Sequence, residues 1–114
     1  SDCSLESFCE MTARTAEVMG VEKIGIGSDL CLNQPDTVVE WMRNGTWTRD
    51  RDFGEGSASA AGFPAQPDWF KDNRDFSNLE SGLRSVGMSE KDVAAVMGEN
   101  WLRFFESSFG PTNT

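Results

Sequence analysis

Asp29 is the residue of this chain that is best placed to do chemistry. It ends the run Lys23-Ile24-Gly25-Ile26-Gly27-Ser28-Asp29, in which isoleucine alternates with glycine as residues do along a β-strand. A carboxylate at the end of a strand can accept a proton and return it to a leaving group, which is general acid–base catalysis. An Asp can equally well cap the turn that follows a strand. The residue types alone leave catalysis and turn capping open.

Histidine is absent from the 114 residues, so no triad or zinc site that needs an imidazole lies within the chain. The three cysteines, Cys3, Cys9 and Cys31, form no CxxC pair, and we interpret them as reduced thiols. We therefore favour a cytoplasmic location. Cys31 lies two residues after Asp29, but it has no histidine or basic partner that would activate it, and we assign it to packing.

Two other kinds of polar residue are weaker candidates. Asn100 stands near Gly98 at a helix junction, where an amide is expected to cap a helix or bond to backbone. Arg74, Arg84 and Arg103 could each bind a carboxylate in bidentate fashion. Because 19 acidic residues offer ordinary salt-bridge partners, the arginines receive no role.

The elements before Asp29 follow the order helix, tight turn, strand. A helix is predicted over residues 5–19, with Ser4 as its N-cap and Gly20 as its stop. A strand is predicted over residues 23–28, and its isoleucines are expected to pack on the apolar stripe of that helix. The stripe includes Leu5, Phe8, Ala16 and Met19. A lone strand leaves its backbone groups unpaired, so its partners are expected before Ser1.

The rest of the chain is predicted to be helical around one long loop. Asp36 can cap a short helix over residues 37–43. The loop over residues 44–76 carries many aromatic residues, and it could be a lid or a structural wrap. Capping-box patterns begin at Ser77 and Ser89, and helices are predicted over residues 78–108 with a break at Gly98. The apolar side of the last helix is Trp101, Leu102, Phe105 and Phe109.

Two separated blocks carry a resemblance to a known family. The first is Gly20 to Asp29, with its G-x-G-S-D ending, and the second includes Gly98-Glu99-Asn100-Trp101-Leu102-Arg103, a G-x-N-x-L-R element. Together they resemble the final strand and the C-terminal helix pair of the membrane (renal) dipeptidases, zinc peptidases of the amidohydrolase-like barrel group. The resemblance covers residues 4–110, and the aromatic loop is most similar to a bacterial branch. It implies an α/β fold, the C-terminal part of a (β/α)8 TIM barrel that typically needs about 250 residues.

The resemblance also implies an activity. In that family two zinc ions activate a water molecule that attacks the peptide bond of a dipeptide. The zinc ligands would lie upstream of this chain, which supplies no metal ligand and alone is expected to be inactive. Asp29 becomes the expected catalytic residue, because functional side chains of a parallel barrel lie at the carboxyl ends of its strands. Many relatives follow this Asp with Phe-Asp-Gly, whereas this chain has Leu30-Cys31-Leu32, so the nearby pocket could differ.

The charge balance limits the partners of the chain. The formal net charge is −9, which argues against binding to nucleic acid or to anionic lipid, and no stretch of the sequence is apolar enough to be a membrane segment. A dipeptide substrate is expected, together with the remainder of the barrel or a homo-oligomer. The alternative is a non-catalytic, acidic helical module that binds a partner through the aromatic loop. A His-x-Asp motif in an upstream reading frame would favour the enzyme.

Overall fold

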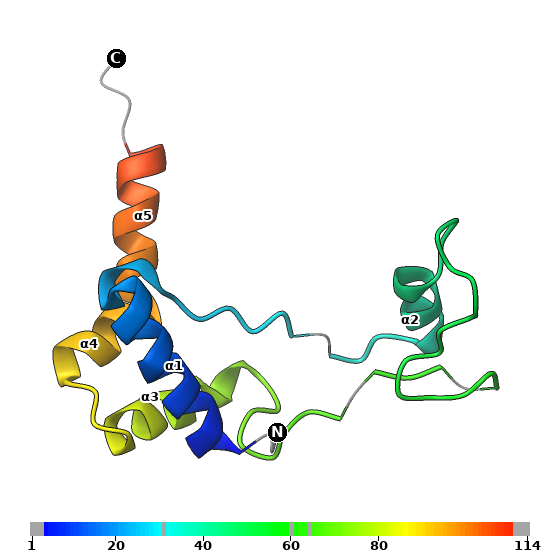
Figure 1. Ribbon diagram of the computed structural model, residues 1–114, viewed down its shortest axis with the longest axis horizontal. Helices are drawn as coiled ribbons and strands as arrows, with labels where there is room; N and C mark the ends of the chain where they lie inside the picture. Colours follow the sequence, from blue (N-terminus) through cyan, green and yellow to red (C-terminus); the bar gives the residue numbers. More distant parts are fainter. Residues whose placement is uncertain (1–3, 31, 60, 64, 111–114) are drawn as a thin grey trace. The chain divides into compact units, whose positions relative to one another are not determined.

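The computed structural model of the chain describes residues 4–30, 32–59, 61–63 and 65–110. Their contacts divide the chain into two compact units. The first unit combines the N-terminal residues up to 28 with the residues from 67 onward, and the second unit spans residues 29–66. Figure 1 shows helices α1, α3, α4 and α5 in the first unit and helix α2 in the second.

Helix α1 (Leu5–Met19) confirms the predicted first helix at both ends. The Ser4 hydroxyl accepts the Ser7 backbone N–H at 3.1 Å, and Gly20 ends the helix with a φ of 92°. Glycine adopts this left-handed conformation without the Cβ clash that other residues meet. The buried face of α1 includes Cys9, but Met19 is 50% exposed, so its predicted place in the core is wrong.

The remaining elements of the first unit follow α1 in chain order. They are η1 (Val21–Lys23), η2 (Asn73–Asp75), α3 (Phe76–Ser85), α4 (Glu90–Ala94), η3 (Ala95–Glu99) and α5 (Asn100–Phe109). The predicted cap at Ser77 is wrong, because α3 begins at Phe76 and the preceding turn is capped by Asp72. The predicted cap at Ser89 and the break at Gly98 are confirmed. Gly98 has a ψ of −30° with extended φ and interrupts the helical backbone before α5.

The core of the first unit joins residues far apart in the sequence. Cys9 of α1 and Leu83 of α3 are fully buried with Val93 and Val96. Gly82 lets α1 and α3 approach closely, since a Cβ at this position would lie 2.6 Å from the Cys9 sulfur. Packing of α1 on α3 and on the C-terminal helices therefore stabilises this unit.

The predicted strand at residues 23–28 is wrong, and so is the assignment of the chain to a TIM-barrel fragment. Among the residues that the structure describes, the one β-type pairing is an isolated bridge between Gly54 and Gly62. Val21–Lys23 form a 3₁₀ turn, and from Ile24 the chain runs on without a neighbouring strand. A strand requires a partner for its backbone groups, and here the side chain of Asn100 bonds to the Ile24 carbonyl instead. The described fold is small and mostly helical.

The second unit is built around α2 (Asp36–Arg43). Asp36 is the first residue of the helix and not its cap, because Pro35 occupies the N-cap position. Val39 is the buried residue of α2, and its Cγ1 would lie 3.0 Å from a Cβ on Gly54. The helix ends at Asn44 as predicted, and the following loop returns to the Gly54–Gly62 bridge.

Candidate functional site

Asp29 is exposed and lies immediately after the extended segment. Its φ is 45°, in the left-handed region that Asp and Asn enter more readily than other residues with a side chain. The residue as a whole is exposed, as a proton acceptor must be. The same backbone conformation is what a turn-forming Asp would adopt, so the backbone geometry at Asp29 is compatible with both interpretations.

The segment that leads to Asp29 keeps its period-two alternation without forming a strand. Ile24 and Ile26 are half-buried against the helical core, whereas Gly25 and Gly27 are exposed. Gly25 lies against the indole of Trp101, because a Cβ at this position would lie 2.9 Å from Cε2. The absence of a side chain at Gly25 thus lets α5 pack close to the backbone.

Asn100 connects this segment to α5. Its side-chain nitrogen donates to the carbonyl oxygens of Val21 at 2.7 Å and Ile24 at 2.8 Å, and the residue is only 7% exposed. Arg103 donates to the Asn100 amide oxygen at 2.6 Å and to the Glu22 carbonyl at 3.1 Å. The prediction that Asn100 bonds to backbone is confirmed. The contacts of Arg103 were missed, although its position three residues after Asn100 on a helix could have indicated them.

A groove runs between residues 22–25 and α5. It has a volume of about 740 Å³ and is lined by Lys23, Trp101, Arg103 and Phe104 among others. Its lining thus combines two aromatic and two cationic side chains. Because Arg103 already donates to Glu22 and Asn100, the groove is first of all a packing feature of the C-terminal helix.

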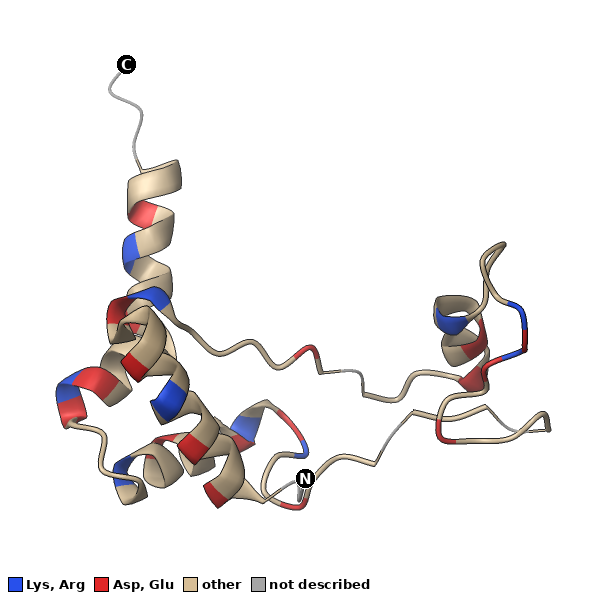
Figure 2. Ribbon diagram, in the orientation of Figure 1, with Lys and Arg blue, Asp and Glu red and all other residues tan. Residues whose placement is uncertain are grey.

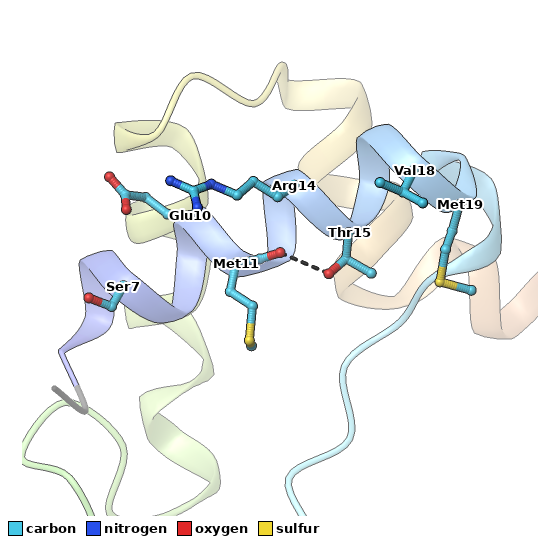
Figure 3. Close-up of a pocket in the computed structure, with 7 residues that line it drawn as sticks. All are labelled: Ser7, Glu10, Met11, Arg14, Thr15, Val18 and Met19. Carbon is cyan, nitrogen blue, oxygen red and sulfur yellow. Dashed lines mark hydrogen bonds between the residues drawn. The ribbon is translucent and has the colours of Figure 1, made fainter. Parts of the chain in front are cut away.

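A second hollow lies along one face of α1, as Figure 3 shows. Its apolar floor is formed by exposed residues, with Met11 at 56% and Val18 at 87%, and Glu10 and Arg14 lie along the same helix. The Thr15 hydroxyl bonds to the Met11 carbonyl at 2.8 Å and so is used within the helix. One helix supplies all of these residues, and the hollow brings together no set of groups for catalysis.

The other two candidate arginines form ion pairs, as the abundance of acidic residues suggested. Arg74 donates from Nε at 2.9 Å to Asp72, and this pairing lowers the pKa of the Asp72 carboxyl to about 2. Arg84 bonds to Glu90 at 2.7 Å, and the guanidinium lowers the pKa of that carboxyl. Figure 2 shows acidic and basic residues interspersed along the described chain. The carboxylate-binding capacity of these arginines is thus used within the protein.

The aromatic loop divides into two parts with different environments. From Pro67 onward it packs on the first unit, where the rings of Trp69 and Phe8 are 5.5 Å apart and Phe70 is buried. In the second unit, Trp47 is 75% exposed and Trp41 on α2 is 79% exposed. The structural-wrap interpretation holds for the part near Trp69.

The cysteines offer little reactivity where the structure describes them. Cys9 is fully buried, and desolvation raises the pKa of its thiol. A buried thiol with a raised pKa is a packing residue. Cys3 and Cys31 lie outside the described residues.

Across the described ranges, no three side chains of Cys, Asp or Glu gather in a way that could hold a metal ion. The sequence contains no histidine.

Within the same described ranges, none of the helices combines the length and the apolar character that a membrane crossing requires. Comparisons of the chain with protein families, with characterised proteins and with solved structures gave no match.

Proposed function

We propose that this chain is the C-terminal portion of a zinc-dependent dipeptidase that hydrolyses the peptide bond of dipeptides. The proposal rests on the resemblance of two sequence blocks to the membrane dipeptidases. The proposal concerns the activity that this resemblance implies. The barrel fold, which the structure contradicts, is not proposed again.

Hydrogen bonds between the two sequence blocks support treating them as parts of one site. Asn100 belongs to the G-x-N-x-L-R block, and its amide donates to the carbonyls of Val21 and Ile24 in the other block. Arg103 of the same block reaches the Glu22 carbonyl. Motifs separated by more than seventy residues are therefore in direct contact, as expected if they were selected together.

In this proposal Asp29 is the proton-transfer residue. Zinc ions held by residues outside this chain would supply the activated water. Asp29 would accept a proton and return it to the leaving amine, and its exposed position after the extended segment gives a substrate access to the carboxylate. The chain alone is expected to be inactive, since its sequence has no histidine and its described residues bring no three metal donors together.

The test uses the complete reading frame that contains this chain, assayed for dipeptide hydrolysis with and without zinc. Asp29→Asn should lower kcat by about 10²–10⁴-fold, because an amide cannot take a proton. Asn tolerates the left-handed φ of 45° at this position, so the backbone should keep its conformation. Asp36→Asn makes the same charge change in the first turn of α2 and should leave kcat within a few-fold.

Three other outcomes would each change the assignment. Activity within a few-fold of the parent in Asp29→Asn would make Asp29 a turn residue. Loss of bound zinc in this variant would make it a metal ligand. No hydrolysis of any dipeptide by the complete, zinc-loaded protein would overturn the proposal itself.

A second candidate function is a non-catalytic interaction module. Apolar side chains along α5 are exposed in the described structure, including Phe105 at 49% and Phe109 at 77%, and Trp47 of the loop is also exposed. Exposed apolar surface of this kind marks protein contact sites. Two results together would favour the module. The complete protein would show no hydrolase activity, and Trp47→Ala would weaken its binding to a partner protein.

A further inference from the structure

Asn44 is the asparagine in this sequence that is followed by glycine. The backbone nitrogen of a following residue can attack the side-chain carbonyl carbon of asparagine, and glycine permits this most readily because it has no Cβ to hinder the approach. The dipeptide Asn44-Gly45 is thus the place in the chain where intramolecular deamidation is chemically favoured.

The structure holds the Asn44 side chain away from this reaction with three hydrogen bonds. Its Nδ2 donates to the carbonyl oxygens of Glu40 at 2.9 Å and Asp52 at 2.8 Å. Its Oδ1 accepts the backbone N–H of Asp52 at 2.9 Å. Both donor hydrogens and one acceptor position are therefore used, and the amide joins the end of α2 to the returning loop.

The attacking nitrogen is also engaged. The Gly45 N–H donates to the Thr48 hydroxyl at 2.7 Å, and the Thr48 N–H donates to the Gly45 carbonyl at 3.0 Å. For the ring to close, the Gly45 nitrogen must leave this turn and the Asn44 side chain must leave Glu40 and Asp52.

We propose that Asn44 is a conformationally gated modification site, protected from deamidation in the folded second unit and modified when residues 44–52 open. In the reaction a bond forms between the Gly45 nitrogen and the Asn44 Cγ. The Cγ–Nδ2 bond breaks, and ammonia leaves with the proton shed by Gly45. Water then opens the cyclic imide at either carbonyl and leaves aspartate or isoaspartate at position 44.

The product cannot restore the native contacts. A carboxylate at position 44 has no hydrogen to donate, and it would face the carbonyl oxygens of Glu40 and Asp52, which the amide now satisfies. The modification thus favours the open loop, and it is irreversible because the ammonia has left. The fraction of chains modified at position 44 therefore increases with the time that the second unit spends open.

The test incubates the full chain at mildly alkaline pH and measures conversion at position 44 by peptide mapping and mass spectrometry. Native chain should convert about tenfold or more slowly than chain held unfolded in urea, because the reaction waits for local opening. Thr48→Val removes the acceptor of the Gly45 N–H and should speed native conversion severalfold. Thr46→Val, a neighbouring change of the same type, should not.

A second measurement examines the product state with Asn44→Asp. This variant should be cleaved faster by trypsin after Arg49 and Arg51, which lie in the loop that Asn44 holds. Asn33→Asp makes the same change at an exposed position and should leave cleavage at these sites unchanged. Equal conversion of native and unfolded chain, or unchanged cleavage in Asn44→Asp, would overturn the proposal.

Discussion

The two units of this chain are held together by different forces. The first buries apolar side chains from α1, α3, α4 and η3 in one cluster that includes Cys9, Leu83 and Val96. Among the described residues of the second, Val39 and Ala61 are the buried apolar side chains, and polar contacts around Asn44 and Asp52 join its helix to its loop. Hydrophobic burial is cooperative over a whole cluster, whereas exposed hydrogen bonds contribute less each. We expect the first unit to unfold as a block and the second to open locally.

Removal of a core side chain from each unit gives the largest expected contrast. Leu83→Ala should lower the free energy of unfolding of the first unit by about 2–5 kcal/mol, because Leu83 is completely buried. Val39→Ala, at a position equally buried in the second unit, should cost about 1–2 kcal/mol. Amide hydrogen exchange, resolved by segment, measures both effects. If either variant lost exchange protection equally in both units, the division into two independently stabilised units would be contradicted.

Asn100 tests whether a polar contact can matter as much as core packing in the first unit. Asn100→Ala removes two hydrogen bonds to backbone and leaves the carbonyls of Val21 and Ile24 without this donor. We expect a loss of about 2–3 kcal/mol in unfolding free energy, since the group is buried. Exchange should rise at the start of α5 and in η1. Asn78→Ala, which removes one such bond to Trp69, is a matched control that should cost less.

The close approach of α1 to α3 can be tested by adding a single methyl group. Gly82→Ala would place its Cβ 2.6 Å from the Cys9 sulfur and 3.0 Å from Leu5, and we expect a cost of about 1–3 kcal/mol. Gly27→Ala places a methyl group where nothing lies within 4 Å and should change the unfolding free energy little. Thermal unfolding of the two variants gives the comparison. A neutral Gly82→Ala would mean that the helices separate at no cost.

Local signals in the sequence predicted the helices well. Ser4, Ser89 and Gly98 act through contacts or backbone conformations within a few residues, so their effects on helix ends could be read directly from the sequence. The strand failed for the opposite reason. The alternation of Ile24 and Ile26 with glycine is present in the structure, but a strand also needs a partner, and local pattern carries no information about one.

The candidate site shows the same limit. Asn100 was expected to bond to backbone because of its place at a helix junction, but its partners, Val21 and Ile24, are more than seventy residues away. The contact of Gly25 with Trp101 depends on the same long-range packing. Asp29 was identified from its position after the alternating segment, and its catalytic role stays a prediction.

The smallest expected effect concerns acid and the turn before α3. Asp72 accepts hydrogen bonds from the Arg74 side chain and its backbone N–H, and these contacts lower the pKa of its carboxyl to about 2 from an ordinary value of 3.8. A carboxyl whose pKa is lower in the folded state stabilises the fold above its unfolded pKa, and this contribution disappears as the pH falls from 3.8 through about 2.

Asp72→Asn should therefore be less stable than the parent at neutral pH, and the difference between the two proteins should shrink over this acid range. Urea unfolding of both proteins at several pH values measures this stability difference. Asp52 and Glu90, whose pKa values are also lowered, are present in both proteins, so their titration cancels in the difference. Because Arg74 is largely exposed, salt should weaken the effect. A stability difference that stays constant from neutral pH to pH 2 would show that the Asp72 charge contributes nothing to the free energy of unfolding.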